Sequence, residues 1–479
     1  MSIQRSTGKG MFNVWLEHEA GRGTQEVGSC LQKGLLCLLL TICFSQTFSH
    51  GVSSLSDKFK ILFQFKQLDF EYPTAAARKS DIDAGLFIPG KPAPIDTDVY
   101  YPGGGRAPMV FVTMPRFQDG IPATLGTIEI DKSGNSLIRP YPAWGWQRNP
   151  KLCNRLRITS VYRVMVDECH RLWVLDSGQL GDTVGCPPQL LAFDLRTHQL
   201  LSKYEIPKDP WNLNSTFVTS VVDIISKQDN CKETYVYMAD CIGHSILVYD
   251  HRYRKSWIVE DETMKPDPKF EKYTIDGTSF ETQDGVLGMA LSPFIPGEGR
   301  RLYYHSMSSD TEHYVKTSDL KNRYLWELRK PFPTLFKTYA GTRKTQSAAE
   351  AIDRNGVQFF GLMKDIEVAC FVTRGEYGIP GNYSDIVASN QKTLQFVSGI
   401  KAIKNPAGGE DIYMVTSRFQ RVATGTLNSA EINFRIQKAS TYELTAHTKC
   451  DPRYSPPIPP RTTGAPNVSP GPVIFPQDR

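Results

Sequence analysis

Ser160-Val-Tyr-Arg-Val-Met-Val-Asp-Glu-Cys-His-Arg-Leu-Trp-Val-Leu-Asp176 is the stretch of sequence that decides the fold. It holds two short apolar runs, Ser160–Asp167 and Leu172–Asp176, which are separated by a polar turn. A third apolar run, Leu190–Asp194, follows after another polar interval. Short runs rich in valine, leucine and aromatic residues, bounded by polar turns, are typical of β-strands. The stretch therefore predicts one antiparallel unit of three or more strands.

The same unit recurs along the chain, and each copy contains an apolar run with an aromatic residue. These runs are Met109–Thr113, Leu172–Asp176, Val236–Asp240, Leu302–Ser306, Gln358–Leu362 and Ile412–Thr416. One blade cannot bury both of its faces, whereas six blades in a ring bury their faces against each other. The repeat therefore predicts an all-β fold, a six-bladed β-propeller. We expect the aromatic residues to pack between blades rather than to stack on a ligand.

The repeats form one domain, which we place at residues 62–450. Two apolar strands near its ends, Ile61–Phe65 and Ile432–Ile436, are suited to share one blade. Pairing them closes the ring, because an unclosed propeller leaves an exposed strand edge. Residues 451–479 are rich in proline, and we expect them to form a disordered tail.

The N-terminal region carries one apolar run, Leu35–Phe44, which follows Lys33 and precedes small polar residues. A run of ten residues is too short to span a bilayer, which needs about 20. A basic flank, a short apolar core and small residues are typical of a secretory signal peptide. We assign residues 1–50 to a signal peptide with a long N-terminal region before its apolar core, and 51–61 to a short lead. A buried strand or helix and an uncleaved signal anchor are the alternatives.

The composition is that of a globular chain with ample core material: 40% of residues are hydrophobic and 11% are aromatic. The net charge of +5 is small and scattered, which argues against a nucleic-acid partner. No Walker, GxGxxG, GxSxG or HExxH motif is present, so we expect no cofactor and name no catalytic residue. After signal cleavage we expect no membrane attachment.

Seven cysteines follow residue 50, and none lies in a CxxC motif or near histidines at zinc-binding spacing. We therefore expect no metal site. In an oxidising compartment we expect disulfides Cys153–Cys231 and Cys370–Cys450, each joining loops of adjacent or closing blades. Cys169–Cys186 is a third, weaker candidate, which leaves Cys241 free. The glycosylation sequons are at Asn214, Asn382 and Asn467.

Several longer stretches resemble the insect Yellow/major royal jelly protein family. They are Met114–Leu125, Ile158–Gly178, Thr282–Pro293 and Asn433–Ile436, in family order. The resemblance runs from about Leu62 to Asp451. It implies a six-bladed propeller, secretion, and a role in cuticle or eggshell pigmentation, reproduction, nutrition or salivary amine capture.

The resemblance also points to a ligand site. Amine-binding salivary members carry Asn-Arg-Phe after a strand end, and this pattern falls on Ser417-Arg418-Phe419. Phe419 keeps an aromatic ring that can stack on a ligand. Ser417 replaces the asparagine with a shorter hydroxyl, which departs from the amine-binding pattern.

Three further polar residues follow the apolar strands. His305 is placed to reach one mouth of the channel, and Asp176 and Asp240 end their strands in similar places. Each aspartate either accepts hydrogen bonds from loop amides or recognises an ammonium group.

Two classes of function follow from these observations. The first is a secreted protein of pigmentation or sclerotisation that binds small aromatic amine or catechol-type ligands, or extracellular matrix and cuticle components. The alternative is a dopachrome-converting isomerase of the melanin pathway. A purely nutritive role is less favoured, because the composition is not skewed.

Overall fold

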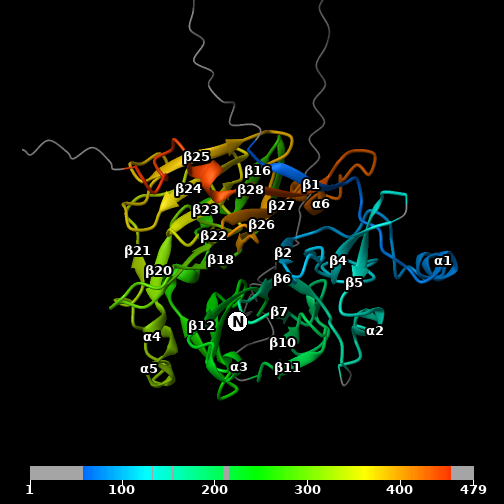
Figure 1. The fold of residues 1–479 in the computed structure, drawn as a ribbon, viewed down its shortest axis with the longest axis horizontal. Helices are drawn as coiled ribbons and strands as arrows, with labels where there is room; N and C mark the ends of the chain where they lie inside the picture. The colour runs from blue at the N-terminus through cyan, green and yellow to red at the C-terminus, as the bar shows by residue number, and fades with distance from the viewer. Residues whose placement is uncertain (1–57, 132, 154–155, 209–214, 455–479) are drawn as a thin grey trace, which may run out of the picture.

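A computed structural model describes residues 58–131, 133–153, 156–208 and 215–454. Within these residues, six four-stranded antiparallel sheets surround a common centre (Figure 1). This arrangement is the predicted six-bladed β-propeller, in a single domain. The signal peptide, most of the lead and most of the proline-rich tail lie outside the described residues.

The blades follow one another along the chain, and each runs from its innermost strand outward, except that the outermost strand of blade 6 comes from the N-terminal end of the domain. Blade 1 consists of β2 (Asp96–Tyr100), β3 (Met109–Thr113), β4 (Leu125–Ile130) and β5 (Ser136–Pro140). Blade 2 consists of β6 (Val161–Val166), β7 (Arg171–Asp176), β10 (Gln189–Asp194) and β11 (Leu200–Glu205). Blade 3 consists of β12 (Phe217–Ile224), β13 (Thr234–Asp240), β14 (Ser245–Asp250) and β15 (Lys255–Glu260).

Blade 4 consists of β18 (Val286–Leu291), β19 (Arg301–Ser306), β20 (His313–Lys316) and β21 (Lys337–Thr338). Blade 5 consists of β22 (Glu350–Ile352), β23 (Val357–Leu362), β24 (Glu367–Val372) and β25 (Ser384–Ser389). Blade 6 consists of β26 (Val397–Lys404), β27 (Glu410–Ser417), β28 (Phe434–Ser440) and β1 (Lys60–Phe65).

The second strand of each blade is buried on both faces, which explains its continuous apolar sequence. The six marker aromatics lie on these strands and are at most 3% exposed: Phe111, Trp173, Tyr237, Tyr303, Phe359 and Tyr413. Five of them belong to the hydrophobic clusters of the core, and Tyr303 is buried beside Tyr314, with the two ring centroids 5.6 Å apart. The interpretation of these rings as core packing is therefore confirmed.

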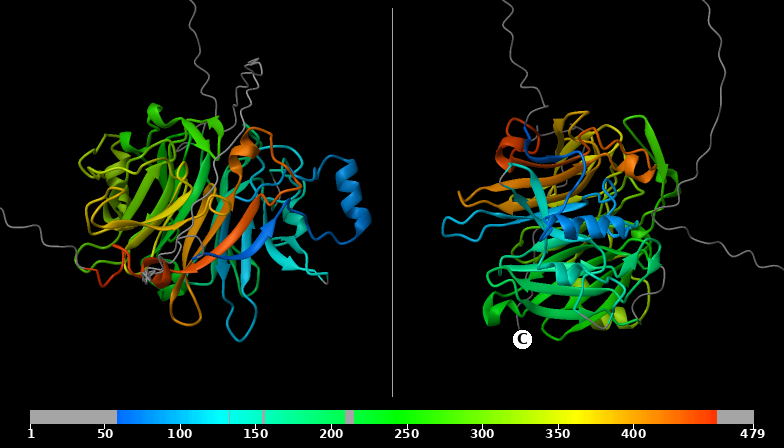
Figure 2. Two further views of the ribbon diagram at one scale, coloured as in Figure 1. Left: turned by 90° about the horizontal axis from the view of Figure 1, so that it is seen from above. Right: turned by 90° about the vertical axis from the view of Figure 1, so that its right-hand side faces the viewer.

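The ring is closed by strands from both ends of the domain, as the sequence predicts. β1 pairs antiparallel with β28, with Phe65 opposite Phe434 and Phe63 opposite Ile436. Figure 2 shows the blue β1 beside the orange β28. Strands far apart in the chain thus complete blade 6.

The innermost strands approach one another closely around the channel. A Cβ at Gly399 of β26 would lie 2.7 Å from the Cα of Asp96 in β2, so only glycine fits there. Next to it, Lys401 donates to both carboxylate oxygens of Asp96 at 2.8 and 2.9 Å, and Asp96 also accepts from the backbone N–H of Val164 in blade 2. One buried carboxylate therefore ties three blades together.

Short elements decorate the two faces. The hairpins are β8 (Gln179–Leu180) with β9 (Thr183–Val184) and β16 (Lys272–Ile275) with β17 (Thr278–Glu281). The helices are α1 (Ala75–Asp83), α2 (Trp144–Gln147), α3 (Gln228–Cys231), α4 (Thr317–Lys321), α5 (Arg323–Glu327), α6 (Phe419–Ala423) and α7 (Thr441–Thr445). Of these, α1 projects from the side of the ring (Figures 1 and 2).

Three disulfides are formed: Cys153–Cys186, Cys169–Cys231 and Cys370–Cys450. The Cys370–Cys450 prediction is confirmed, and Cys241 is the free, buried cysteine among the described residues. The predicted pairs Cys153–Cys231 and Cys169–Cys186 are wrong. Cys153 precedes blade 2 and is joined to the β9–β10 loop of that blade, whereas Cys169, in the β6–β7 turn, reaches α3 of blade 3. Chain order alone cannot distinguish these partners, because both lie at blade edges.

Two other expectations concern the surface. Asn382 is exposed in a turn before β25, so its glycosylation stays a prediction that the structure accommodates. Asn214 and Asn467 lie outside the described residues. Among the described residues, no helix has the length and apolar character needed to cross a membrane.

Candidate functional site

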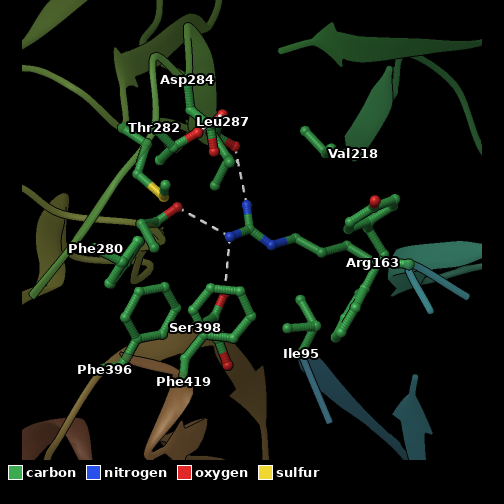
Figure 3. Close-up of a pocket in the computed structure, with 14 residues that line it drawn as sticks. Ile95, Arg163, Val218, Phe280, Thr282, Asp284, Leu287, Phe396, Ser398 and Phe419 are labelled. Carbon is green, nitrogen blue, oxygen red and sulfur yellow. Dashed lines mark hydrogen bonds between the residues drawn. The ribbon is translucent and has the colours of Figure 1, made fainter. Parts of the chain in front are cut away.

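An apolar pocket lies at the mouth of the channel where the second strands end and the innermost strands begin. We call it the channel pocket. Its lining residues come from every blade or the loops beside it: Ile95, Phe117, Tyr162, Arg163, Val218, Phe280, Thr282, Asp284, Leu287, Met307, Ala348, Phe396, Ser398 and Phe419 (Figure 3). The pocket is narrow, since the centre of a water molecule can occupy only about 30 Å³ of it.

Arg163 forms the floor of the channel pocket. It projects from β6 across the channel axis and is 4% exposed. One terminal nitrogen donates to Thr219 Oγ1 and to the Leu287 carbonyl at 2.9 Å; the other donates to the carbonyls of Ala348 and Ser398 at 2.9 and 2.7 Å. A single guanidinium in blade 2 thereby connects blades 3, 4, 5 and 6.

Aromatic rings form one wall of the pocket. Phe396 and Phe419 stack with their centroids 4.6 Å apart, and Phe280 and Phe117 meet Phe419 edge-on at 5.9 and 6.3 Å. In Figure 3 the rings of Phe280, Phe396 and Phe419 gather on one side of the Arg163 guanidinium. Such a wall favours a flat, aromatic ligand.

Asp284 is the carboxylate of the pocket lining, and it lies across the guanidinium from these rings (Figure 3). Its side chain is fully buried. Oδ1 accepts a hydrogen bond from Thr282 Oγ1 at 2.8 Å, whereas Oδ2 has no hydrogen-bond partner among the described residues. Burial raises the pKa of Asp284 to about 6, and the hydrogen bond from Thr282 lowers it in part.

Of the three consecutive residues singled out in the sequence, the structure places Phe419 in the pocket lining. Ser417 is buried at the end of β27, where its N–H donates to the Gln395 carbonyl. Arg418 turns away and pairs with Glu431. The structure therefore brings Phe419 to the pocket, with Ser417 and Arg418 behind it.

Asp176 and Asp240 are buried under loops of the same face and do not line the channel pocket. Asp176 accepts from the N–H groups of Thr159 and Ser160 at 2.9 and 2.8 Å. Asp240 accepts from the N–H groups of Thr216 and Gly243 at 2.7 and 2.8 Å. Both side chains therefore hold loop backbone.

His305 is fully buried between blades 4 and 5 and does not line the pocket. Its Nδ1 lies 3.1 Å from Glu312 Oε2 and 2.9 Å from Glu350 Oε2. Burial and Arg343 act to lower the pKa of His305, but the two glutamates outweigh them and raise it. A Cβ at Gly288 would lie 2.4 Å from the imidazole, so the histidine also requires that glycine.

His305, Glu312 and Glu350 offer one ligand atom each within 4.8 Å of one another, as a metal site would. However, Arg343 donates to Glu312 at 2.8 Å, and Gln358 donates to both glutamates. Arg343 and Gln358 thus already donate to the carboxylate oxygens that a cation would need. We therefore interpret the cluster as a buried ion network that joins two blades.

The other mouth of the channel is a wide polar funnel of about 840 Å³, and Arg163 lines it from the opposite side. At its rim Glu168 lies between Lys227 and Lys404, at 2.5 Å from each ammonium group. Hydrogen bonds from these lysines lower the pKa of Glu168 to about 2. The two mouths therefore differ in kind: one is narrow and apolar, and the other is wide and charged.

Sequence reasoning named only Phe419 among the lining residues, and the residues that it missed include Arg163, Phe280, Asp284 and Phe396. Asp284 lies in Thr282–Pro293, one of the stretches that carry the family resemblance, and Arg163 interrupts an apolar strand. The sequence could have singled out these two residues, because a charged side chain within or beside a buried strand needs a specific partner. Phe280 and Phe396 look like ordinary core aromatics in the sequence.

Comparison with known proteins identifies the family. A sequence profile described as "Major royal jelly protein" matches residues 159–450. The chain is 36% identical over 405 residues to major royal jelly protein 9 of Apis mellifera, an alignment that covers 82% of this chain and 90% of the relative. The chain belongs to the Yellow/major royal jelly protein family.

Two further relatives show the range of this family. The chain is 30% identical over 417 residues to dopaminechrome tautomerase of Drosophila melanogaster, covering 85% of this chain and 87% of that protein. It is also 30% identical over 446 residues to protein yellow of Drosophila pseudoobscura pseudoobscura, covering 91% and 76%. Relatives of similar identity thus include an enzyme and royal jelly proteins.

Proposed function

We propose that this Yellow/major royal jelly protein is a secreted propeller of pigmentation or sclerotisation that binds a small, flat aromatic ligand of catechol or indole type. The observation that carries the proposal is the channel pocket, in which stacked Phe396 and Phe419 face a buried carboxylate, Asp284. Three disulfides support secretion, since such bonds persist in oxidising compartments.

The chemistry of the pocket supports this ligand class. Stacked rings favour a planar π-system, and apolar neighbours desolvate it. A carboxylate with a free oxygen adds recognition of an ammonium group or of an N–H or O–H donor. A catecholamine, an indoleamine or their oxidised products carry both features.

A second candidate function is tautomerisation of a cyclised quinone, the reaction class named by the Drosophila melanogaster relative. This reaction only relocates protons, so it needs no redox cofactor but does need an acid–base group beside the substrate. Asp284 is an acid–base group in the channel pocket, and it is the observation that supports tautomerisation as an alternative to ligand binding alone.

Calorimetry with serotonin and dopamine tests the ligand proposal. Phe419→Ala removes a ring from the stack and should weaken binding by about 1–3 kcal/mol. Phe294→Ala is the matched control, because Phe294 is 65% exposed at the funnel side of the molecule. Absence of binding to the wild type, or equal affinities of wild type and Phe419→Ala, would contradict the proposal.

The Ser417 position gives a second arm of this test. Ser417→Asn restores the pattern of the amine-binding members behind Phe419, and it should strengthen amine binding. An unchanged affinity would show that the ring wall, rather than this residue, determines ligand binding.

A further inference from the structure

We infer that Asp284 is the catalytic acid–base residue of the channel pocket, taking a carbon-bound proton from a cyclised catecholamine quinone held there. The inference rests on the proposed function, because it requires the ligand to occupy this pocket. It goes further by assigning the proton transfer to one atom of the protein, Asp284 Oδ2.

The position of Asp284 is suited to this role. The residue directly precedes Gly285 and β18, and its own N–H donates to Ser308 Oγ at 3.0 Å. With Oδ1 held by Thr282, rotation of the carboxylate is restricted. Oδ2 is the buried oxygen without a partner among the described residues, and the residue lines the pocket. A base must have such a free oxygen within reach of the proton that it removes.

The charged and titratable groups around Asp284 leave it available. Arg163 makes four hydrogen bonds to Thr219, Leu287, Ala348 and Ser398, and none of them goes to Asp284. Burial raises the pKa values of the nearby Tyr162, Tyr273 and Cys241, so these groups stay neutral.

The electrostatic setting suits a base that works near neutral pH. A carboxylate with a pKa of about 6 is mostly ionised at pH 7, yet it is more basic than an exposed aspartate. The Arg163 guanidinium, held by neutral acceptors, adds a fixed positive charge at the pocket floor. This charge favours the negative charge that develops on a quinone oxygen as the proton leaves carbon.

The reaction balances without any co-reactant. In each of two steps one C–H bond of the five-membered ring breaks, its electron pair enters the ring system, and one quinone oxygen gains a proton. Two C–H bonds are replaced by two O–H bonds, so the quinone becomes a dihydroxyindole of the same formula. Asp284 accepts the carbon-bound proton and releases it to the oxygen or to water, which returns the carboxylate to its starting form.

The test follows the loss of dopaminechrome absorbance with wild-type protein and Asp284→Asn. Wild type should accelerate the loss, with a rate that rises with pH through about 6 as the carboxylate ionises. Asp284→Asn should lower the rate about 100-fold or more, the usual contribution of a positioned base. Serotonin binding to the wild type is measured in parallel, so that occupancy of the pocket is tested separately from the rate.

Two further variants keep the test decisive. Asp353→Asn is the matched control, because Asp353 is also buried with a pKa raised to about 6 by burial but lies outside the pocket. Its rate should stay within twofold of wild type. Thr282→Val removes the hydrogen bond that favours the ionised form of Asp284, so the pH midpoint of the rate should move upward. This shift tests the inference even where Asp284→Asn fails to fold.

The outcomes separate the two proposals. Wild type that binds serotonin but does not accelerate the conversion overturns the role of Asp284 and leaves ligand binding intact. Acceleration that is unchanged in Asp284→Asn, or that has no pH dependence between 5 and 7.5, also overturns it. Wild type that neither binds nor converts overturns the proposed function itself.

Discussion

Replacing Arg163 with methionine removes the guanidinium that bridges five blades while keeping a side chain of similar length. Thr219 Oγ1 still donates to the Leu287 carbonyl at 2.6 Å, so that acceptor keeps a partner. The carbonyls of Ala348 and Ser398 lose the donors that Arg163 supplies at 2.9 and 2.7 Å. The structural cost is therefore concentrated in blades 5 and 6.

Each orphaned buried acceptor costs about 1–3 kcal/mol, so two cost about 2–6 kcal/mol. Water entering from the polar funnel replaces part of the lost hydrogen bonding, which brings the expected loss to about 2–4 kcal/mol. The unfolding entropy is about 2.1 cal/mol/K per residue, so a domain of roughly 400 residues should melt about 2–5 °C lower.

The assay is thermal unfolding followed by intrinsic fluorescence, since the chain has seven tryptophans. Arg163→Lys should lie between wild type and Arg163→Met, because an ammonium group supplies fewer and shorter-reaching donors. Arg252→Met is the matched control, as Arg252 is exposed on blade 3. If Arg163→Met melts within 1 °C of this control, the guanidinium does not hold the blades together and the reasoning is refuted.

Three other predictions concern closure, cross-linking and pH. Deleting residues through Phe65 removes β1, so the ring stays open and cooperative unfolding should be lost; an unchanged calorimetric transition would contradict the closure. Replacing both Cys370 and Cys450 with serine opens a cross-link between residues 80 apart, and should lower stability by roughly 2–5 kcal/mol in denaturant unfolding. Asp284→Asn should be more stable than wild type at pH 7.5 by about 3 kcal/mol, with little difference at pH 4. The sign follows because folded wild type holds the Asp284 proton up to about pH 6, whereas the unfolded chain releases it near pH 4. The contribution of Asp284 to wild-type stability therefore falls as pH rises from about 4 to 6. Equal melting temperatures of wild type and Asp284→Asn at both pH values would contradict this.

The propeller could be predicted from the sequence because its strands are encoded locally. The run Leu172–Asp176 and its counterparts are apolar at most of their positions, and burial on both faces favours that pattern in every blade. Closure could be predicted too, since Ile61–Phe65 had no partner within its own neighbourhood. Both features can be predicted from the repeat of apolar runs along the chain and from the unfavourable exposure of an unpaired strand edge.

The pocket could be predicted only in part, because it depends on distances between blades. Phe419 was predicted through a resemblance, but its stacking on Phe396 depends on where the start of α6 meets the loop before β26. His305 was expected at the channel mouth, yet its ring points between blades toward Glu312 and Glu350. The cysteine pairings failed for the same reason, since several cysteines lie at blade edges and only three-dimensional proximity selects among them.

The pairing of β1 with β28 also has a consequence for how the protein is made. β1 is synthesised first, and its partner follows roughly 370 residues later, between Phe65 and Phe434. At about 5–20 residues per second, the ribosome takes about 20–70 s to reach β28. During that time β1 is a short strand without a neighbour, so a newly made chain can build five blades in order but must await its own last segment before the sixth is complete. The seam between β1 and β28 is thus the final step of assembly, and a chain cut short anywhere before Phe434 cannot form a closed ring.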